Sequence, residues 1–148
     1  MIEEASVDFI TADDAMKLRV ANALGDQAAR HMHIQDGFSI VALHVEEPVG
    51  LVSVQWRNLP PPLSAAHEGF IDIIEVHQDF RHRGIARHLV ELSLERGRAH
   101  GAYQVRAWSS EDKLAAIPMW QALGFTLCPA VTVAQGKEVS GFFAAIVL

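Results

Sequence analysis

Hydrophobic and polar residues alternate along the first 56 residues with spacings that predict two helices among three strands. Met16, Val20 and Leu24 recur every four residues, as on one face of a helix, and Gly25 marks its end. Runs of β-branched and apolar residues on both sides of an E-E-P motif predict a hairpin. The expected order is strand, helix, helix, strand and strand, at residues 6–10, 15–24, 26–35, 39–45 and 49–56.

A strand–turn–helix–strand pattern dominates the middle of the chain. A nearly continuous apolar run at 70–76 predicts a strand that is covered on both faces. The helix that follows places Ile85, Leu89 and Leu92 on one face. A strand at 103–108 is then expected to run parallel to the strand at 70–76, through a right-handed crossover.

The last part of the chain predicts a short helix and a hairpin. The helix is expected to start near residue 115 and to end at Gly124, because Pro118 is tolerated only in a first helical turn. The final hairpin is expected at 131–148, turning at Gly136. The whole order predicts a mixed α/β sandwich around one sheet.

Length and composition predict one domain over residues 1–148, because half of the residues are apolar and suffice for one core. Cys128 is the single cysteine, so an internal disulfide is excluded and a cytoplasmic location is expected. The N-terminus lacks the basic start and apolar run of a signal peptide. No apolar stretch approaches the roughly 20 residues that cross a bilayer, so no membrane partner is expected.

The charged residues favour a small anionic ligand over a nucleic acid. The formal net charge of −6 argues against the basic surface that nucleic-acid-binding domains usually carry. Arginines are nevertheless concentrated between residues 81 and 106. Within this stretch, Arg96 and Arg98 are expected to solvate a helix face instead of binding a ligand.

The turn at residues 77–86 combines three features of an anion-binding site. The first N–H groups of a helix lack intrahelical partners and, with the helix dipole, attract phosphate groups. Arg81, His82 and Arg83 add side-chain charge, and Gly84 lets the backbone approach a ligand without a Cβ atom. The P-loop and dinucleotide-binding patterns, G-x-x-x-x-G-K-[ST] and G-x-G-x-x-G, do not occur in the sequence.

The run V-H-Q-D-F-R-H-R-G-I-A-R-H-L resembles the acetyl-coenzyme A signature of the GNAT acetyltransferase superfamily. That signature is Arg or Gln, two variable residues, Gly, one variable residue and then Gly or Ala; Arg81, Gly84 and Ala86 supply it here. The later run A-I-P-M-W-Q-A-L-G-F resembles a second landmark of the family, a helix that ends in Gly-Phe. The resemblance covers almost the whole chain and implies a mixed, mostly antiparallel central sheet, about four flanking helices and a β–turn–α–β coenzyme A binding unit.

The resemblance implies acetyl-CoA as cosubstrate and transfer of its acetyl group to a primary amine, by direct attack in a ternary complex. The backbone of the turn would cradle the pyrophosphate, and the N–H group of Val76 would stabilise the oxyanion formed on attack. The residues implied in cofactor binding are Val76, Arg81, His82, Arg83, Gly84, Ile85, Ala86, Arg87, Ser109 and Trp120.

A general base is needed because an alkylamine, with a pKa of about 10, is mostly protonated at neutral pH. In the family a carboxylate on the strand before the turn commonly fills this role. Asp72 is the first candidate in this sequence and Glu75 the second, with Glu68 and His77 as outsiders. Asp72 alternatively is a structural carboxylate held by a hydrogen bond.

The clearest departure from the family pattern is Trp120, at a position where a tyrosine usually protonates the leaving thiolate. An indole N–H group is not a usable acid at neutral pH, and Trp120 is expected mainly to pack. Tyr103, the single tyrosine, is a poor substitute, whereas Ser109, Ser110 or water are possible helpers. A thiol leaves with a pKa of about 8.5, so the acid is dispensable.

The remaining expectations concern metals and partners. His31 and His33 are two residues apart, and no metal-ligand spacing occurs, so no metal is expected. The acceptor is expected to be a small-molecule or peptide amine, and the final hairpin suits a homodimer interface or burial within the monomer. The alternative function is a non-catalytic acyl-CoA binding or sensing domain on the same fold. Lys113 is expected to be a surface lysine or to reach a coenzyme A phosphate.

Overall fold

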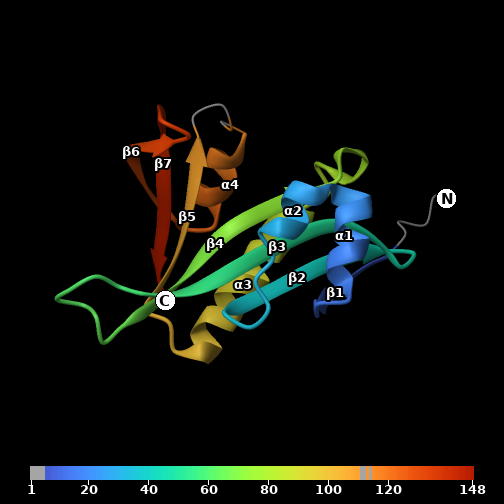
Figure 1. Ribbon diagram of the computed structural model, residues 1–148, viewed down its shortest axis with the longest axis horizontal. Coiled ribbons are helices and arrows are strands. Elements are labelled where there is room, and N and C mark those ends of the chain that lie inside the picture. Colours follow the sequence, from blue (N-terminus) through green and yellow to red (C-terminus); the bar gives the residue numbers. More distant parts are fainter. Residues whose placement is uncertain (1–5, 111–112, 114) are drawn as a thin grey trace. The chain divides into compact units, whose positions relative to one another are not determined.

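The computed structural model describes residues 6–110, 113 and 115–148, and its elements follow each other as drawn in Figure 1. The seven strands are β1 Val7–Thr11, β2 Gly37–His44, β3 Glu47–Asn58, β4 His67–Val76, β5 Gln104–Ser110, β6 Thr126–Ala134 and β7 Lys137–Val147. The helices are α1 Met16–Leu24, α2 Asp26–Arg30, α3 Ile85–His100 and α4 Ala116–Ala122, with a 3₁₀ turn, η1, at Gln78–Phe80.

The strands form one sheet in the order β1-β2-β3-β4-β5-β7-β6. The β4–β5 pair is parallel, whereas the pairs β1–β2, β2–β3, β5–β7 and β6–β7 are antiparallel. The predicted fold class, a mixed α/β fold with a mostly antiparallel sheet and four helices, is therefore confirmed. None of the described helices has the length and apolar character that crossing a bilayer requires.

The chain divides into two compact units, which are described separately below. Unit 1 comprises Met1–Trp56 and Asp72–Ser93, and unit 2 comprises Arg57–Ile71 and Leu94–Leu148. Strand β4 and helix α3 each contribute one part to both units. The single-domain organisation of residues 1–148 stays a prediction.

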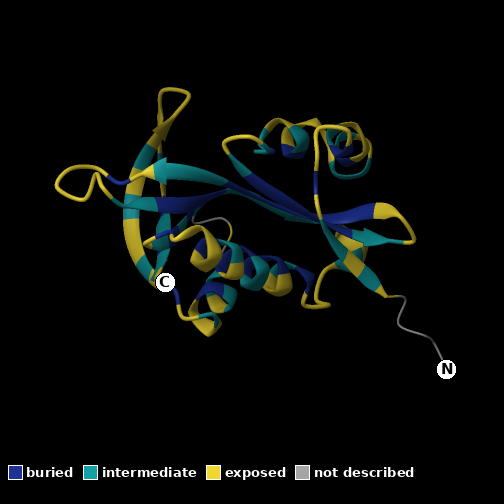
Figure 2. Ribbon diagram, turned by 90° about the horizontal axis from the view of Figure 1, so that it is seen from below, coloured by how far each residue is buried: buried dark blue, intermediate teal, exposed yellow. Residues whose placement is uncertain are grey.

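In unit 1, helices cover both faces of the strands β2 and β3 (Figures 1 and 2). On one face, Met16 and Val20 of α1 pack with Val41 of β2 and Leu51 of β3 in a buried cluster. On the other face, the start of α3 approaches β3 so closely that a Cβ atom at Gly50 would lie 3.0 Å from a methyl group of Ile85. The periodicity of the first helix and the glycine of β3 thus determine how this unit packs.

In unit 2, the first half of β4 pairs with β5 in parallel register, Glu68 opposite Gln104 and Ile71 opposite Ala107. Strand β7 lies between β5 and β6 and pairs with both in antiparallel register. Helix α4 contributes Trp120, which is buried against Phe125 with ring centroids 4.8 Å apart.

Several element boundaries differ from those that the sequence predicts. Helix α2 ends at Arg30 and not at residue 35, since the chain turns at His31. Strand β4 begins three residues earlier than predicted, at His67, and the final hairpin begins at Thr126 because β6 pairs with β7 along its whole length. The predicted turn at the E-E-P motif lies one residue earlier, at Val45 and Glu46, both with positive φ angles.

Candidate functional site

The turn after β4 has the backbone that an anion site needs. After the short η1 turn, His82 has φ 64° and Gly84 has φ 78°, so two left-handed residues alternate with ordinary ones. Helix α3 then begins at Ile85, and its first intrahelical bond runs from the N–H of His88 to the carbonyl of Gly84 over 3.0 Å. The N–H groups before His88 belong to the helix start and have no intrahelical acceptors. Successive N–H groups in such turns form concave anion sites.

The arginines of the turn have different partners. Arg81 folds back onto the end of β4, where its Nε donates to the carbonyl of Val76 over 3.1 Å. Its guanidinium also lies 3.5 Å from Glu75. The Arg83 guanidinium lies 4.9 Å from the ring centroid of Phe80. In this structure Arg81 therefore ties the turn to the strand.

The remaining turn residues at the start of α3 divide by burial. Ile85 is buried, and its side chain belongs to the hydrophobic core. Ala86 is partly buried, and Arg87 is exposed and pairs with Glu91 on the same helix, N to O 3.2 Å. All the cofactor-binding residues predicted between Val76 and Arg87 thus lie in one continuous strand end, turn and helix start of unit 1.

Asp72 lies in a cluster with side chains that the sequence analysis did not connect with it. Its Oδ2 atom is 3.2 Å from Nδ1 of His31 and 2.8 Å from Nε2 of His33. The other ring nitrogen of His33, Nδ1, is 3.0 Å from Asp36. We call Asp72, His31, His33 and Asp36 the Asp72 cluster; all four belong to unit 1.

The electrostatics of this cluster keep its carboxylates ionised. Burial alone would raise the pKa of Asp72, but hydrogen bonds from His33 and His31, and the charges of both rings, hold it below the ordinary value. Burial alone would likewise raise the pKa of Asp36, but hydrogen bonds from His33 and Gln55 and the charge of His33 together outweigh it, so this pKa is lowered too. Both carboxylates are therefore negatively charged at neutral pH.

The other predicted base candidates contact groups other than imidazoles. Glu75 lies beside Arg81, as described above. The His77 ring accepts a hydrogen bond from the N–H of Asp79 and so caps η1. Glu68, in unit 2, is buried and receives bonds from Gln104 and from both Nε and a terminal nitrogen of Arg106, at 2.7 to 3.2 Å. Of these four candidates, Asp72 is the one whose partners are imidazoles.

The two site residues predicted in unit 2 contact each other. The Trp120 side chain is 1% exposed, and its indole N–H donates to the hydroxyl of Ser109 over 3.3 Å. This burial agrees with the packing role expected for Trp120. Tyr103, the residue directly before β5, is exposed, and Lys113 is exposed as well.

His31 and His33 are the residues that sequence reasoning missed. They lie 41 and 39 positions before Asp72, so no local spacing connects them with it. Their spacing in the sequence is relevant only to metal binding. Among residues 6–110, 113 and 115–148 no group of three or more His, Cys, Asp or Glu side chains is arranged to hold a metal ion. To predict this cluster, one would have to know that the segment after α2 lies beside strand β4.

Comparison with known families and structures agrees with the sequence motif. Residues 7–125 match the family model described as "Acetyltransferase (GNAT) family". The chain therefore belongs to the GNAT acetyltransferase family, and the predicted resemblance is confirmed. The sequence has no significant match among curated proteins.

Solved structures of GNAT acetyltransferases share the fold. Arabidopsis thaliana NAA60 in complex with a bisubstrate analogue superposes with a TM-score of 0.79 at 14% identity, over 97% of this chain and 99% of that chain. NAA60 in complex with acetyl-CoA gives 0.77 at 13% identity, over 97% and 99%. The ribosomal-protein-S18-alanine N-acetyltransferase from Escherichia coli gives 0.75 at 11% identity, over 96% and 94%. At these identities the likeness shows the fold alone.

Proposed function

We propose that this protein is an N-acetyltransferase that moves the acetyl group of acetyl-CoA to a primary amine, by direct attack in a ternary complex. The observation that carries the proposal is the end of strand β4. Within a few residues this segment supplies an ionised carboxylate with two imidazole partners, at Asp72, and the anion-type turn that begins α3. Membership of the GNAT family supplies the reaction class.

The turn is the proposed site of the donor. Its left-handed residues, His82 and Gly84, orient backbone N–H groups that suit the pyrophosphate of coenzyme A. An added Cβ atom at Gly84 would meet nothing within 4 Å, so the space beside this glycine is open. The N–H of Val76 is the proposed donor to the oxyanion that forms when the amine attacks the thioester. That NAA60 has been solved with acetyl-CoA supports this cosubstrate.

The Asp72 cluster is the proposed site of proton removal from the acceptor. A cationic amine must lose a proton before its nitrogen can attack. Because Asp72 and Asp36 are both ionised, the cluster also attracts a positively charged acceptor. Glu75 is the second candidate for this role, although its carboxylate already faces the guanidinium of Arg81.

The leaving thiolate is proposed to depart without a dedicated tyrosine. Trp120 occupies the corresponding position and is buried, with its N–H directed at Ser109. A thiol has a pKa of about 8.5, so its thiolate is a good leaving group that water can protonate afterwards. The same substitution motivates the alternative, an acyl-CoA binding or sensing domain without turnover.

A direct assay separates the two functions. Thiol release from acetyl-CoA is measured with a panel of small-molecule amines and of peptides with free N-terminal amines, the latter suggested by the alanine N-acetyltransferase neighbour. Calorimetry measures acetyl-CoA binding in parallel. Turnover with an amine supports the acetyltransferase, and tight binding without turnover on any amine supports the sensing domain. A protein that neither binds acetyl-CoA nor releases thiol contradicts both.

A further inference from the structure

The two histidines of the Asp72 cluster have different hydrogen-bonding environments, and these give them different roles. We propose that His31 is the group that takes the proton from the acceptor amine, that Asp72 is the positioning residue for its ring, and that His33 is a fixed cation behind Asp72. This inference rests on the proposed function, because it names the base of the same reaction.

His33 is placed to donate a hydrogen bond from each of its two ring nitrogens. Its ring bridges two carboxylates, Nε2 to Asp72 at 2.8 Å and Nδ1 to Asp36 at 3.0 Å. An ionised carboxylate only accepts hydrogen bonds, so both ring nitrogens must carry a proton. The side chain is 14% exposed, and the backbone is held by the N–H bond to Ser53 and by the hydroxyl of Ser39, which donates to the His33 carbonyl. His33 therefore has no free nitrogen that can accept a proton.

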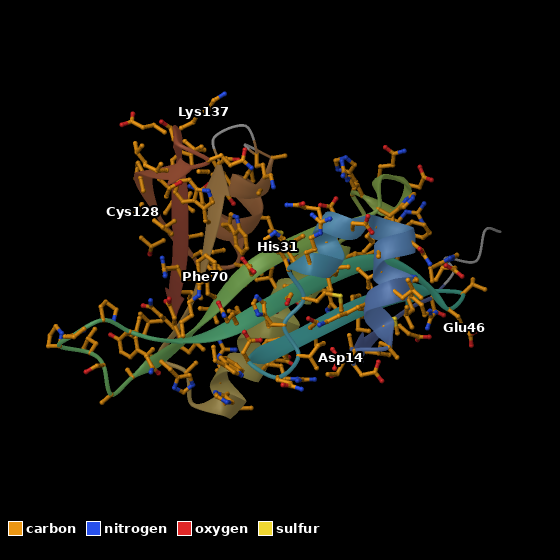
Figure 3. The ribbon with its side chains drawn as sticks, in the orientation of Figure 1. Asp14, His31, Glu46, Phe70, Cys128 and Lys137 are labelled. Carbon is orange, nitrogen blue, oxygen red and sulfur yellow. The ribbon has the colours of Figure 1, made fainter. Side chains whose placement is uncertain are left out.

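His31 presents the opposite arrangement. Its Nδ1 faces Asp72 at 3.2 Å and must donate to this carboxylate, which places the ring proton on Nδ1. The other nitrogen, Nε2, lies 3.5 Å from the side-chain amide nitrogen of Gln27, which is a donor. Nε2 therefore keeps its lone pair. The side chain is 40% exposed at the end of α2, where Figure 3 labels it, so an acceptor can reach this nitrogen.

The charged groups around His31 belong to the Asp72 cluster. The titratable groups that face it are Asp72 directly, and His33 with Asp36 behind Asp72, while Gln27 adds a neutral amide. Two carboxylates and one imidazolium sum to one negative charge. A proton on His31 brings the formal charge of the cluster to zero. An imidazole ordinarily titrates at a pKa of about 6.5, nearer to neutral pH than a carboxyl group.

The proton and electron balance of the reaction is complete with these groups. The alkylammonium gives one proton to Nε2 of His31 and becomes a neutral amine. The amine lone pair forms the C–N bond to the thioester carbonyl, and the carbonyl electrons move to oxygen. The oxyanion then reforms the carbonyl, the C–S bond breaks and the thiolate receives the second amine proton, directly or through water. His31 releases its proton to solvent, and the enzyme returns to its starting state.

Three variants and one control test the assignment on the full-length protein. In His31→Asn the side-chain amide can still donate to Asp72 from the position of Nδ1, but the basic nitrogen is missing. We expect kcat to fall about 100-fold or more, the range of general base catalysis, with the KM for acetyl-CoA within about 3-fold. His31→Gln should behave in the same way. His100→Asn, on α3 in unit 2, is the matched histidine control and should keep both parameters.

Asp72→Asn gives a signature that a purely structural role lacks. Its amide can donate to Nδ1 of His31, which moves the ring proton to Nε2 and blocks the base, as in carboxylate–imidazole pairs generally. We expect a loss in kcat similar to that of His31→Asn. In the wild type, the log of kcat/KM for the amine should fall on the acidic side of its pH profile, and this limb should disappear in His31→Asn.

Nitrogen-15 NMR of the free wild-type protein adds a test that needs neither turnover nor a variant. The expected result at mildly alkaline pH is a proton on Nδ1 of His31 and none on Nε2; a proton on Nε2 overturns the inference. If the wild type is active and His31→Asn keeps its kcat and its pH profile, the inference alone is wrong. If the wild type acetylates no amine, the proposed function fails and the inference fails with it.

Discussion

Replacing Arg106 by methionine should destabilise the protein strongly, because it leaves a buried carboxylate without its counter-ion. Glu68 is 3% exposed, and Arg106 reaches it with two nitrogens, the shorter contact being 2.7 Å. The same guanidinium lies against the rings of Phe70 and Phe143, 5.0 and 4.8 Å from their centroids. Methionine keeps much of the apolar contact with these rings and removes the charge.

The expected loss is about 3 kcal/mol in the free energy of unfolding at pH 7. Removing one partner of a buried ion pair typically costs about 3–5 kcal/mol. The lower end applies, because Gln104 still donates to Glu68 over 2.7 Å and Arg57 remains nearby. Against a total stability of about 5–15 kcal/mol for an ordinary domain, such a loss is easily measured.

The pH dependence provides a sharper test than the loss itself. Burial alone would raise the pKa of Glu68, but the hydrogen bonds and charge of Arg106, with Gln104 and Arg57, lower it below 4.5. A lowered folded-state pKa contributes stability above the unfolded-state value, and this stability is lost as the pH falls through the folded-state value. Without Arg106, burial dominates and the pKa of Glu68 rises, so protonation relieves the variant. The difference in the free energy of unfolding between wild type and variant should therefore be smaller at pH 4.5 than at pH 7.

Urea unfolding at both pH values, followed by circular dichroism, measures these free energies. Arg98→Met is the matched control, since Arg98 is exposed on α3, and it should cost less than about 1 kcal/mol. A loss in Arg106→Met below about 1 kcal/mol at pH 7, or a gap that widens on acidification, would refute the reasoning.

Two further substitutions test the donor site. In Gly84→Ala and in Gly84→Glu, a residue with a Cβ atom must adopt the positive φ angle, which costs about 1–2 kcal/mol in both variants. The space beside this glycine is open, so an added Cβ atom meets no clash in either variant. Only the glutamate adds negative charge, so calorimetry should show an acetyl-CoA Kd at least about 10-fold higher for Gly84→Glu than for Gly84→Ala; equal values contradict the cradle. Trp120→Phe loses the 3.3 Å bond to Ser109 and should lower the unfolding free energy by about 1–3 kcal/mol, with kcat within about 3-fold. A large fall in kcat with an unchanged melting temperature would instead place Trp120 in the reaction.

Local sequence patterns were sufficient to predict the segment in which β4 is followed by the turn and helix α3. A continuous apolar run, a glycine and a helical repeat follow one another, and each depends on neighbours a few residues away. The structure has α3 beginning at Ile85, with Ile85 and Leu89 buried as the repeat predicts and Leu92 partly buried. Gly84, where the backbone was expected to approach a ligand without a Cβ atom, has a positive φ angle.

The left-handed conformation of His82 was not predictable in the same way. Positive φ angles are uncommon outside glycine, and the R-H-R-G run does not by itself establish that His82 adopts one in addition to Gly84. The short α2 is a similar case. Its polar sequence continues past Arg30, but the segment from His31 to Asp36 forms side-chain bonds with Asp72 and within itself in place of another helical turn.

Two of the three carboxylates of β4 show why the base could not be chosen from the sequence. Glu68 and Asp72 lie on one strand, and in both the pKa is lowered by partners that outweigh burial. Their partners differ in chemistry: the guanidinium of Arg106 stays protonated, whereas an imidazole can exchange a proton near neutral pH. The pairing of Glu68 with Arg106 therefore favours a structural role, while Asp72 has the contact with His31 on which the proposed proton transfer rests. That distinction depends on pairings across 38 and 41 positions, which only the folded chain brings together.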